Sequence, residues 1–153
     1  MKYFVFAATL LAASAAMAQE PPFLAKAAQG DMAEVDMGYL AQSHGTSANV
    51  RAYGKMLVDD HGAHREKIVA IAEARKITVP AAVSAGQKAT HDQMAEIKGA
   101  DFDAAFKAHM IEDHQKDIAD YKAQLAGGDA QVAALAKDTL PVLEKNLAAA
   151  QKL

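Results

Sequence analysis

The sequence predicts an all-α protein built as a four-helix bundle, and three observations lead to this fold class. The chain after residue 22 is rich in Ala, Lys, Glu, Gln, Leu and Met, all of which favour helix. The sequence shows neither the period-two alternation of strands nor an Asn-Gly or Asp-Gly hairpin turn. Apolar residues instead recur every three or four positions in four long segments. Four such helices, with two short turns and one long connection, are typical of a bundle.

The first two helices are separated by a short break. We expect the first helix from about residue 22 to 43 and the second from about 47 to 76. Gly45 is expected to end the first helix in the left-handed conformation, which glycine adopts at little cost. Thr46 or Ser47 is expected to cap the second helix, because a hydroxyl oxygen can accept from the free N–H groups of its first turn.

The second half of the chain begins with a long connection. It carries a short amphipathic helix at about 87–98 and is followed by a third long helix at 101–126, with Asp101 as the expected cap. The fourth helix spans about 129–151 and contains Pro141, which should bend it or loosen a turn. The connection either crosses over along the bundle or folds back as a cap, and the sequence leaves both open.

Residues 1–18 are expected to form a cleaved signal peptide. Lys2 precedes an apolar run at 3–13, and Ala16-Met17-Ala18 matches an A-x-A cleavage signal. The run is shorter than the ~20 apolar residues that a transmembrane helix needs. We therefore expect residues 19–153 to form one exported, periplasmic domain, with peripheral association at the outer membrane or with another envelope protein left open.

Composition narrows the range of functions. The formal net charge is −3 and no basic block occurs, so the chain is a poor nucleic-acid binder. No segment after the signal peptide is long and apolar enough to span a bilayer. The sequence has no cysteine, which excludes thiolate nucleophiles, iron–sulfur clusters and cysteine-ligated zinc. A metal site would have to use His, Asp, Glu, backbone oxygen or water.

Two Asp-His pairs, in LVDDHGAH (57–64) and MIEDHQKD (110–117), stand behind apolar residues. Helical periodicity places His61, His64 and His114 in register with the apolar stripes of the second and third long helices. Glu34 has a similar register on the first helix. Counted from the nearest turns, Glu34, His61 and His114 all fall near the middle of the bundle, so we expect them to converge there.

The convergence suggests a metal centre. Buried polar groups are costly without partners, and one metal ion satisfies imidazoles and carboxylates together. The candidate ligands are Glu34, His61 and His114. Further ligands, or groups that orient them, are His64, Asp60, Asp113 and Asp117. Such nitrogen and oxygen donors suit zinc, copper, iron or manganese.

A closed network of hydrogen bonds and ion pairs, with a purely structural role, is the alternative to a metal centre. The sequence contains no Glu-x-x-His, the motif that di-iron bundles carry on two helices, so di-iron chemistry is not expected.

Four stretches carry a resemblance to a known family: FLAKAAQGDMAEVDMGYLA, VRAYGKMLVDDHGAH, FDAAFKAHMIEDH and DTLPVLEKNLAAA. The chain resembles an uncharacterised family of exported bacterial proteins, often labelled predicted outer-membrane proteins, whose domain of unknown function is placed among ferritin-like helical bundles. The resemblance implies a ferritin-like four-helix bundle with a short helix in the connection between the second and third long helices. It marks as pattern positions Glu34, Asp60, His61, Phe102-Asp103, His114 and Leu140-Pro141. The family pattern continues LP-x-L-x-x-H, whereas this chain has Asn146 at the last position.

Together these features predict a non-enzymatic periplasmic binding protein, with a metal ion as the candidate ligand and, by family analogy, a link to envelope stress. The first alternative is a structural or interaction protein of the cell envelope with a purely structural polar core. The second is a metal-dependent enzyme, which needs an open coordination position and a pocket leading to it. The sequence shows neither of these.

Overall fold

The computed structural model describes residues 23–127 and 129–153, and these residues form five helices and no strand. The helices are α1 (Phe23–His44), α2 (Ala48–Ala74), α3 (Ala85–Glu96), α4 (Ala100–Leu125) and α5 (Ala130–Ala150). The predicted all-α fold class is confirmed. The expected signal peptide and helix start at residue 22 lie outside the described residues. Within the described ranges, no helix is long and apolar enough to cross a membrane.

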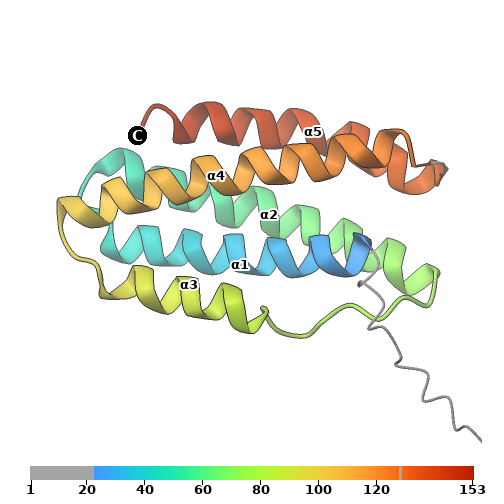
Figure 1. Cartoon of the computed structure of the whole chain (residues 1–153), viewed down its shortest axis with the longest axis horizontal. Coiled ribbons are helices and arrows are strands. Elements are labelled where there is room, and N and C mark those ends of the chain that lie inside the picture. Colours follow the sequence, from blue (N-terminus) through green and yellow to red (C-terminus); the bar gives the residue numbers. More distant parts are fainter. Residues whose placement is uncertain (1–22, 128) are drawn as a thin grey trace, which may run out of the picture.

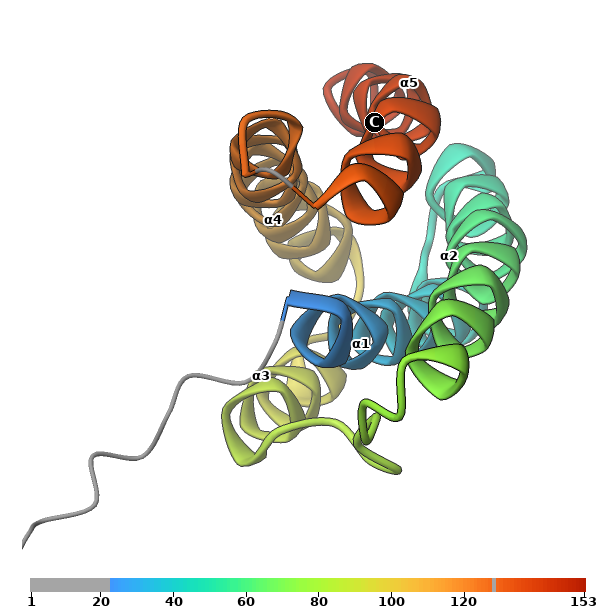
Figure 2. The same cartoon turned by 90° about the vertical axis from the view of Figure 1, so that its right-hand side faces the viewer.

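The four long helices lie side by side, and the shorter α3 packs on the outside of α1 (Figures 1 and 2). The most extensive packing joins α1 to α2 and α4 to α5. Lys26, near the start of α1, pairs at 3.0 Å with Asp120, near the end of α4, so these helices are antiparallel. Since α1 and α2 are also antiparallel, α2 and α4 run in the same direction. The connection that carries α3 therefore crosses over along the length of the bundle (Figure 1).

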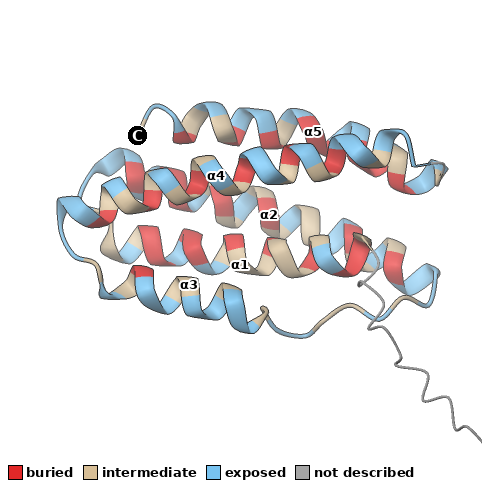
Figure 3. Ribbon diagram, viewed as in Figure 1, coloured by how far each residue is buried: buried red, intermediate tan, exposed pale blue. Residues whose placement is uncertain are grey.

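Buried residues occur along all four long helices (Figure 3). Apolar clusters pack toward both ends of the bundle, and buried polar residues separate them in the middle. On α4, for example, Phe106 and Met110 belong to one apolar cluster and Ile118 to another, with His114 between them. The same interruption occurs on the other three long helices. We call these interrupting residues the polar layer: Asp31, Glu34, His61, His64, His114, Thr139 and Asn146.

Close contact between α1 and α2 depends on two glycines. A Cβ added at Gly38 would lie 2.6 Å from the Gly54 carbonyl oxygen, and a Cβ at Gly54 would lie 2.6 Å from the Gly38 carbonyl oxygen. Each clash is with backbone, so the helices themselves would have to separate. These helices carry Asp31, Glu34 and His61, so the glycine contact also fixes the spacing of the polar layer.

Replacing Gly38 by alanine is therefore expected to destabilise the fold by about 1–3 kcal/mol, as overpacking does in well-packed cores. Urea unfolding followed by circular dichroism measures this change. Gly62→Ala is the control, since a Cβ at Gly62 has no neighbour within 4 Å and alanine favours helix. Equal stability of the two variants would contradict the close contact.

Of the two expectations for the turn between α1 and α2, one is confirmed and one is wrong. Ser47 caps α2 as predicted, since its hydroxyl accepts from the Val50 N–H at 3.0 Å. The expectation of a left-handed Gly45 is wrong, because positive φ occurs in the described residues only at Lys76 and Gly99. Gly45 instead provides space, since a Cβ there would lie 2.6 Å from the Ala41 carbonyl oxygen.

The expected cap of α4 is also wrong. Gly99, with φ 67°, is the residue that precedes α4. Asp101 lies inside the first turn, where its negative charge interacts favourably with the positive end of the helix dipole. Leu125, the last residue of α4, is 48% exposed, whereas Ile118 is buried. On α5, the helix continues through Pro141.

Candidate metal centre

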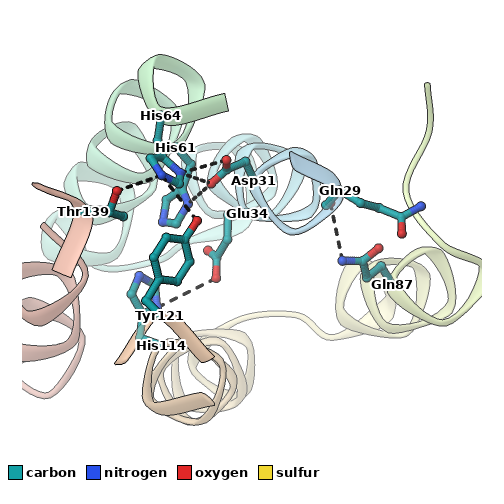
Figure 4. A network of polar contacts seen from close by, with 9 residues as sticks. All are labelled: Gln29, Asp31, Glu34, His61, His64, Gln87, His114, Tyr121 and Thr139. Atoms are coloured by element: carbon teal, nitrogen blue, oxygen red, sulfur yellow. Dashed lines mark hydrogen bonds and ion pairs between the residues drawn. The ribbon is translucent and has the colours of Figure 1, made fainter. Parts of the chain in front are cut away.

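The polar layer brings side chains from four helices to one point (Figure 4). Asp31 and Glu34 lie one turn apart on the inward face of α1, and His61 and His64 lie one turn apart on α2. His114 enters from α4. The exposed fractions are 1% for Glu34, 3% for His61 and 0% for His114, so solvent does not satisfy these groups.

The first histidine, His61, is oriented by a carboxylate on α1. Its Nδ1 lies 2.9 Å from Oδ1 of Asp31. Burial acts to raise the pKa of Asp31, but hydrogen bonds from His61 and His64 outweigh it and hold that pKa below its usual value. Asp31 is therefore an ionised acceptor, and the His61 Nδ1–H donates to it. This leaves Nε2 of His61 buried, with no hydrogen-bond partner among the described residues.

His114 is arranged in the same way by a different acceptor. Its Nδ1 lies 2.9 Å from the Met110 carbonyl oxygen, which can only accept, so Nδ1 carries the proton. Burial, assisted by the nearby His61, lowers the pKa of His114 to about 4, so the ring is neutral at pH 7. Nε2 is again buried without a partner in the described part of the chain. Metal-binding histidines are typically oriented through their second nitrogen in this manner.

Glu34 supplies a carboxyl group whose two oxygens are both buried and unpartnered among residues 23–127 and 129–153. Its nearest imidazole contact is His114 Nδ1 at 3.8 Å, too long for a hydrogen bond. Burial, followed by the nearby negative charge of Asp113, raises the pKa of Glu34 well above its ordinary value. The carboxyl group therefore holds its proton to a higher pH than an ordinary glutamate does.

The three groups are close enough to share one ion. One ligand atom from each of Glu34, His61 and His114 lies within 4.8 Å of the other two. Bonds of ~2.1 Å to a central ion join atoms up to ~4.2 Å apart, so side-chain shifts of less than about 1 Å would complete the coordination. The arrangement offers two imidazole nitrogens and one carboxylate, a donor set that fits zinc, iron, manganese and copper.

A second layer of contacts fixes Asp31. His64 Nδ1 lies 2.9 and 3.1 Å from the two oxygens of Asp31, while its Nε2 lies 2.9 Å from the Thr139 hydroxyl and 3.3 Å from the Tyr121 hydroxyl. Both nitrogens of His64 are therefore occupied. His64 acts as a support for Asp31, and through it for His61, instead of as a ligand.

Of the remaining predicted residues, two lie beside Glu34 and one lies outside the centre. Asp113 and Asp117 on α4 form a second group with Glu34, again with ligand atoms within 4.8 Å of one another. Burial and the neighbouring charge of Asp113 raise the pKa of Asp117 to about 7. Asp60 joins neither group, because it pairs with Lys145 at 2.7 Å.

Asn146 lies at the height of the centre on α5. It is fully buried between Leu143 and Ala150, and neither amide atom has a hydrogen-bond partner within the described ranges. Its neighbour Lys145 pairs with Asp60, which adjoins His61 in sequence. Eight buried side-chain polar atoms in the described residues lack a partner, and six belong to Glu34, His61, His114 and Asn146. The unsatisfied polarity is thus concentrated in one layer, where an ion and its water would satisfy it.

Sequence periodicity missed the groups that orient the ligands. Asp31 shares the register of Glu34, one turn earlier, which is the signal that could have identified it. No comparable sequence signal identifies Thr139 or the Met110 carbonyl. Threonines are common on helices and every residue has a backbone oxygen, so neither group stands out in the sequence.

The centre has an opening on each side of the bundle. A cavity of about 510 Å³ lies between α1, α3 and α4, and Glu34 and Asp113 are part of its wall. A smaller one of about 150 Å³, between α2 and α5, is lined by His61, His64 and Thr139. An ion could therefore approach from either side.

Replacing Asp31 by asparagine is expected to weaken zinc binding roughly 10- to 100-fold, the usual effect of losing an orienting carboxylate. Competition with a chromogenic chelator measures the affinity. Asp60→Asn is the matched control, because Asp60 precedes His61 directly but pairs only with Lys145. An equal loss in both variants would mean that charge near His61, and not orientation of its ring, controls binding.

Comparison with known proteins gives one result. Residues 7–153 match the model of a domain of unknown function, DUF4142. No curated protein and no solved structure is similar enough to count as a match. Because the matched region covers nearly the whole sequence, the chain belongs to the DUF4142 family.

Proposed function

We propose that this protein is a metal-binding protein that holds one divalent transition-metal ion through Glu34, His61 and His114. One observation carries the proposal. Glu34, His61 and His114 converge, and each has at least one buried ligand atom without a hydrogen-bond partner among the described residues. Each histidine also has its Nδ1 fixed by an acceptor. A purely structural network would leave several buried groups unsatisfied, at a cost of about 1–3 kcal/mol each.

The crossover of the long connection supports a ferritin-like arrangement of the helices. The bundle differs from di-iron members of that class in its ligands, since Glu-x-x-His is absent from the sequence. We therefore propose a mononuclear histidine site as the primary function.

Zinc binding is expected to release about one proton per ion at pH 7. Burial and the charge of Asp113 raise the pKa of Glu34, which favours its protonated form before binding, and Glu34 must ionise to become a ligand. His114, with a pKa of about 4, has no proton to lose at this pH. The affinity should consequently rise with pH until Glu34 is ionised in the free protein.

Calorimetric titration in buffers of different ionisation enthalpy measures the proton release. The apparent binding enthalpy should depend linearly on the buffer's ionisation enthalpy, with a slope of about one. Zinc binding with no dependence on the buffer would contradict ionisation of Glu34.

A specific observation favours a second candidate, a metal-dependent enzyme. Three protein ligands leave a coordination position open, and the cavity of about 510 Å³ meets the centre at Glu34. Azide added to the cobalt-substituted protein tests this candidate. A change in the visible spectrum would show an exchangeable position, and an unchanged spectrum would leave binding or storage as the role.

The proposed location is the periplasm. The apolar run of residues 3–13 after Lys2 and the A-x-A signal ending at Ala18 support export. Mass spectrometry of the protein from a periplasmic extract should give a mature chain that begins at Gln19. A full-length chain in the cytoplasmic fraction would contradict export, and with it the envelope-stress role suggested by family analogy.

A further inference from the structure

Glu34 belongs to two groups of potential ligands. One contains His61 and His114, and the other contains Asp113 and Asp117. In each group, the ligand atoms lie within 4.8 Å of one another. Because a carboxylate has two oxygens, a single glutamate can contact a cation on each side.

Asp113 and Asp117 lie on one face of α4, since residues four apart in a helix are neighbours. Both are half-buried, whereas Glu34 is only 1% exposed. Three carboxyl groups packed together in this way are stabilised either by binding protons or by positive partners.

The nearby basic groups compensate this charge poorly. Lys116 reaches Asp117 only at 4.0 Å and approaches Asp120 more closely, at 3.6 Å. Asp113 has no ion-pair partner within the described part of the chain. Both oxygens of Glu34 are buried there without a hydrogen-bond partner, which is a separate indication of a missing ligand.

The second group also has its own access to solvent. The cavity of about 510 Å³ between α1, α3 and α4 reaches Glu34 and Asp113, and acidic Asp36 and Asp92 form part of its wall. A narrower cavity of about 70 Å³ is lined by Asp113 and Asp117. Figure 4 shows Gln87 of α3 beside Gln29 of α1, whose carbonyl it contacts at 3.4 Å, so α3 is held in place as the outer wall.

We propose that Glu34, Asp113 and Asp117 form a second divalent-cation position, which shares the Glu34 carboxylate with the histidine site. This inference rests on the proposed function for the shared ligand, but its donors differ. Three carboxylates and no imidazole favour hard cations such as Mn²⁺, Mg²⁺ or Ca²⁺, whereas the histidine site suits zinc. The centre would then hold two different metals at adjacent positions.

The test loads the protein with one equivalent of zinc and then titrates it with Mn²⁺, counting free Mn²⁺ by its electron paramagnetic resonance signal. The wild-type protein is expected to bind one Mn²⁺ per chain while it retains its zinc. The double variant Asp113→Asn/Asp117→Asn should retain zinc and bind Mn²⁺ at least about tenfold more weakly, since two of three charged ligands are lost. Asp120→Asn, on the same helix but paired with Lys26, is the control and should bind as the wild type does.

The outcomes separate the two proposals. Zinc binding without a Mn²⁺ equivalent, or Mn²⁺ binding that the double variant retains, would overturn the second position and leave the histidine site intact. Displacement of zinc by Mn²⁺ would also overturn it, because the two ions would compete for one position. Failure of the wild type to bind zinc would overturn the proposed function. It would also overturn the proposal that Glu34 is shared between two cation positions.

Discussion

Replacing His61 by alanine is expected to abolish zinc binding and leave the helical fold in place. His61 supplies one of only two nitrogen ligands, and its Nε2 is already free of other partners in the described structure. The loss of affinity should therefore far exceed the ~100-fold that removal of an orienting group causes. Equilibrium dialysis with zinc measures binding, and circular dichroism measures helicity.

Two further variants make this result interpretable. His61→Leu fills the space with an apolar side chain, so it separates the loss of a ligand from the loss of packing. His44→Ala removes a half-buried histidine at the end of α1, outside the polar layer, and should bind zinc normally. Zinc retained by both His61 variants would exclude His61 as a ligand.

Replacing Glu34 by glutamine is expected to eliminate zinc binding and, in contrast, to stabilise the metal-free protein. The pKa of Glu34 is raised in the folded state by burial and by Asp113. Between the unfolded pKa and this higher value, the folded state binds more protons, so its stability falls as the pH rises. A neutral amide of the same shape removes that penalty, so the metal-free variant should be more stable than the wild type at pH 7.

Thermal unfolding with and without zinc measures both effects. In the wild type, zinc at 100 times its dissociation constant should raise the Tm on the order of 10 °C, through ~2.7 kcal/mol of binding energy. In Glu34→Gln the metal-free Tm should rise and zinc should have no effect. Asp36→Asn, an exposed acid two residues further along α1, is the control. A metal-free variant less stable than the wild type would mean that Glu34 has a structural role.

Helical periodicity was sufficient to predict which faces of the helices meet. His61 and His114 occupy core positions in otherwise apolar stripes, and their distances from the turns put them at one height. The structure brings both residues together with Glu34. Whether these residues bind metal stays a prediction, because no periodicity distinguishes a ligand from a satisfied core histidine.

The remainder of the centre depends on interactions that a single sequence does not display. Asp60 and Asp31 are both plausible partners for His61, but only the crossing of α1 and α2 shows that Asp31 binds its Nδ1 while Asp60 pairs with Lys145. The direction of α4 depends on the long connection, whose irregular part has no period to follow. The proposed second cation position depends on the proximity of Asp113 and Asp117 to Glu34, which the sequence alone does not show.

Asn146 stands where the family pattern has histidine, and this difference affects the ligands that the centre can offer. The resemblance expects histidine at this position, and the structure buries the asparagine at the height of the centre with an unpartnered amide. An amide is a weaker ligand for transition metals than an imidazole, but it can hydrogen-bond to a water on the ion. This chain is therefore expected to hold its metal with three protein ligands and solvent.

The metal content of the mature protein is the most direct test of the metal centre. The protein would be purified from the periplasm without chelator or histidine tag, analysed for zinc, copper, iron and manganese, and unfolded thermally with and without EDTA. If the polar layer is a metal centre, we expect at least about one transition-metal ion per chain and a Tm that EDTA lowers. A protein free of metal, whose Tm changes neither with EDTA nor with added zinc, would show that the polar layer is a structural network.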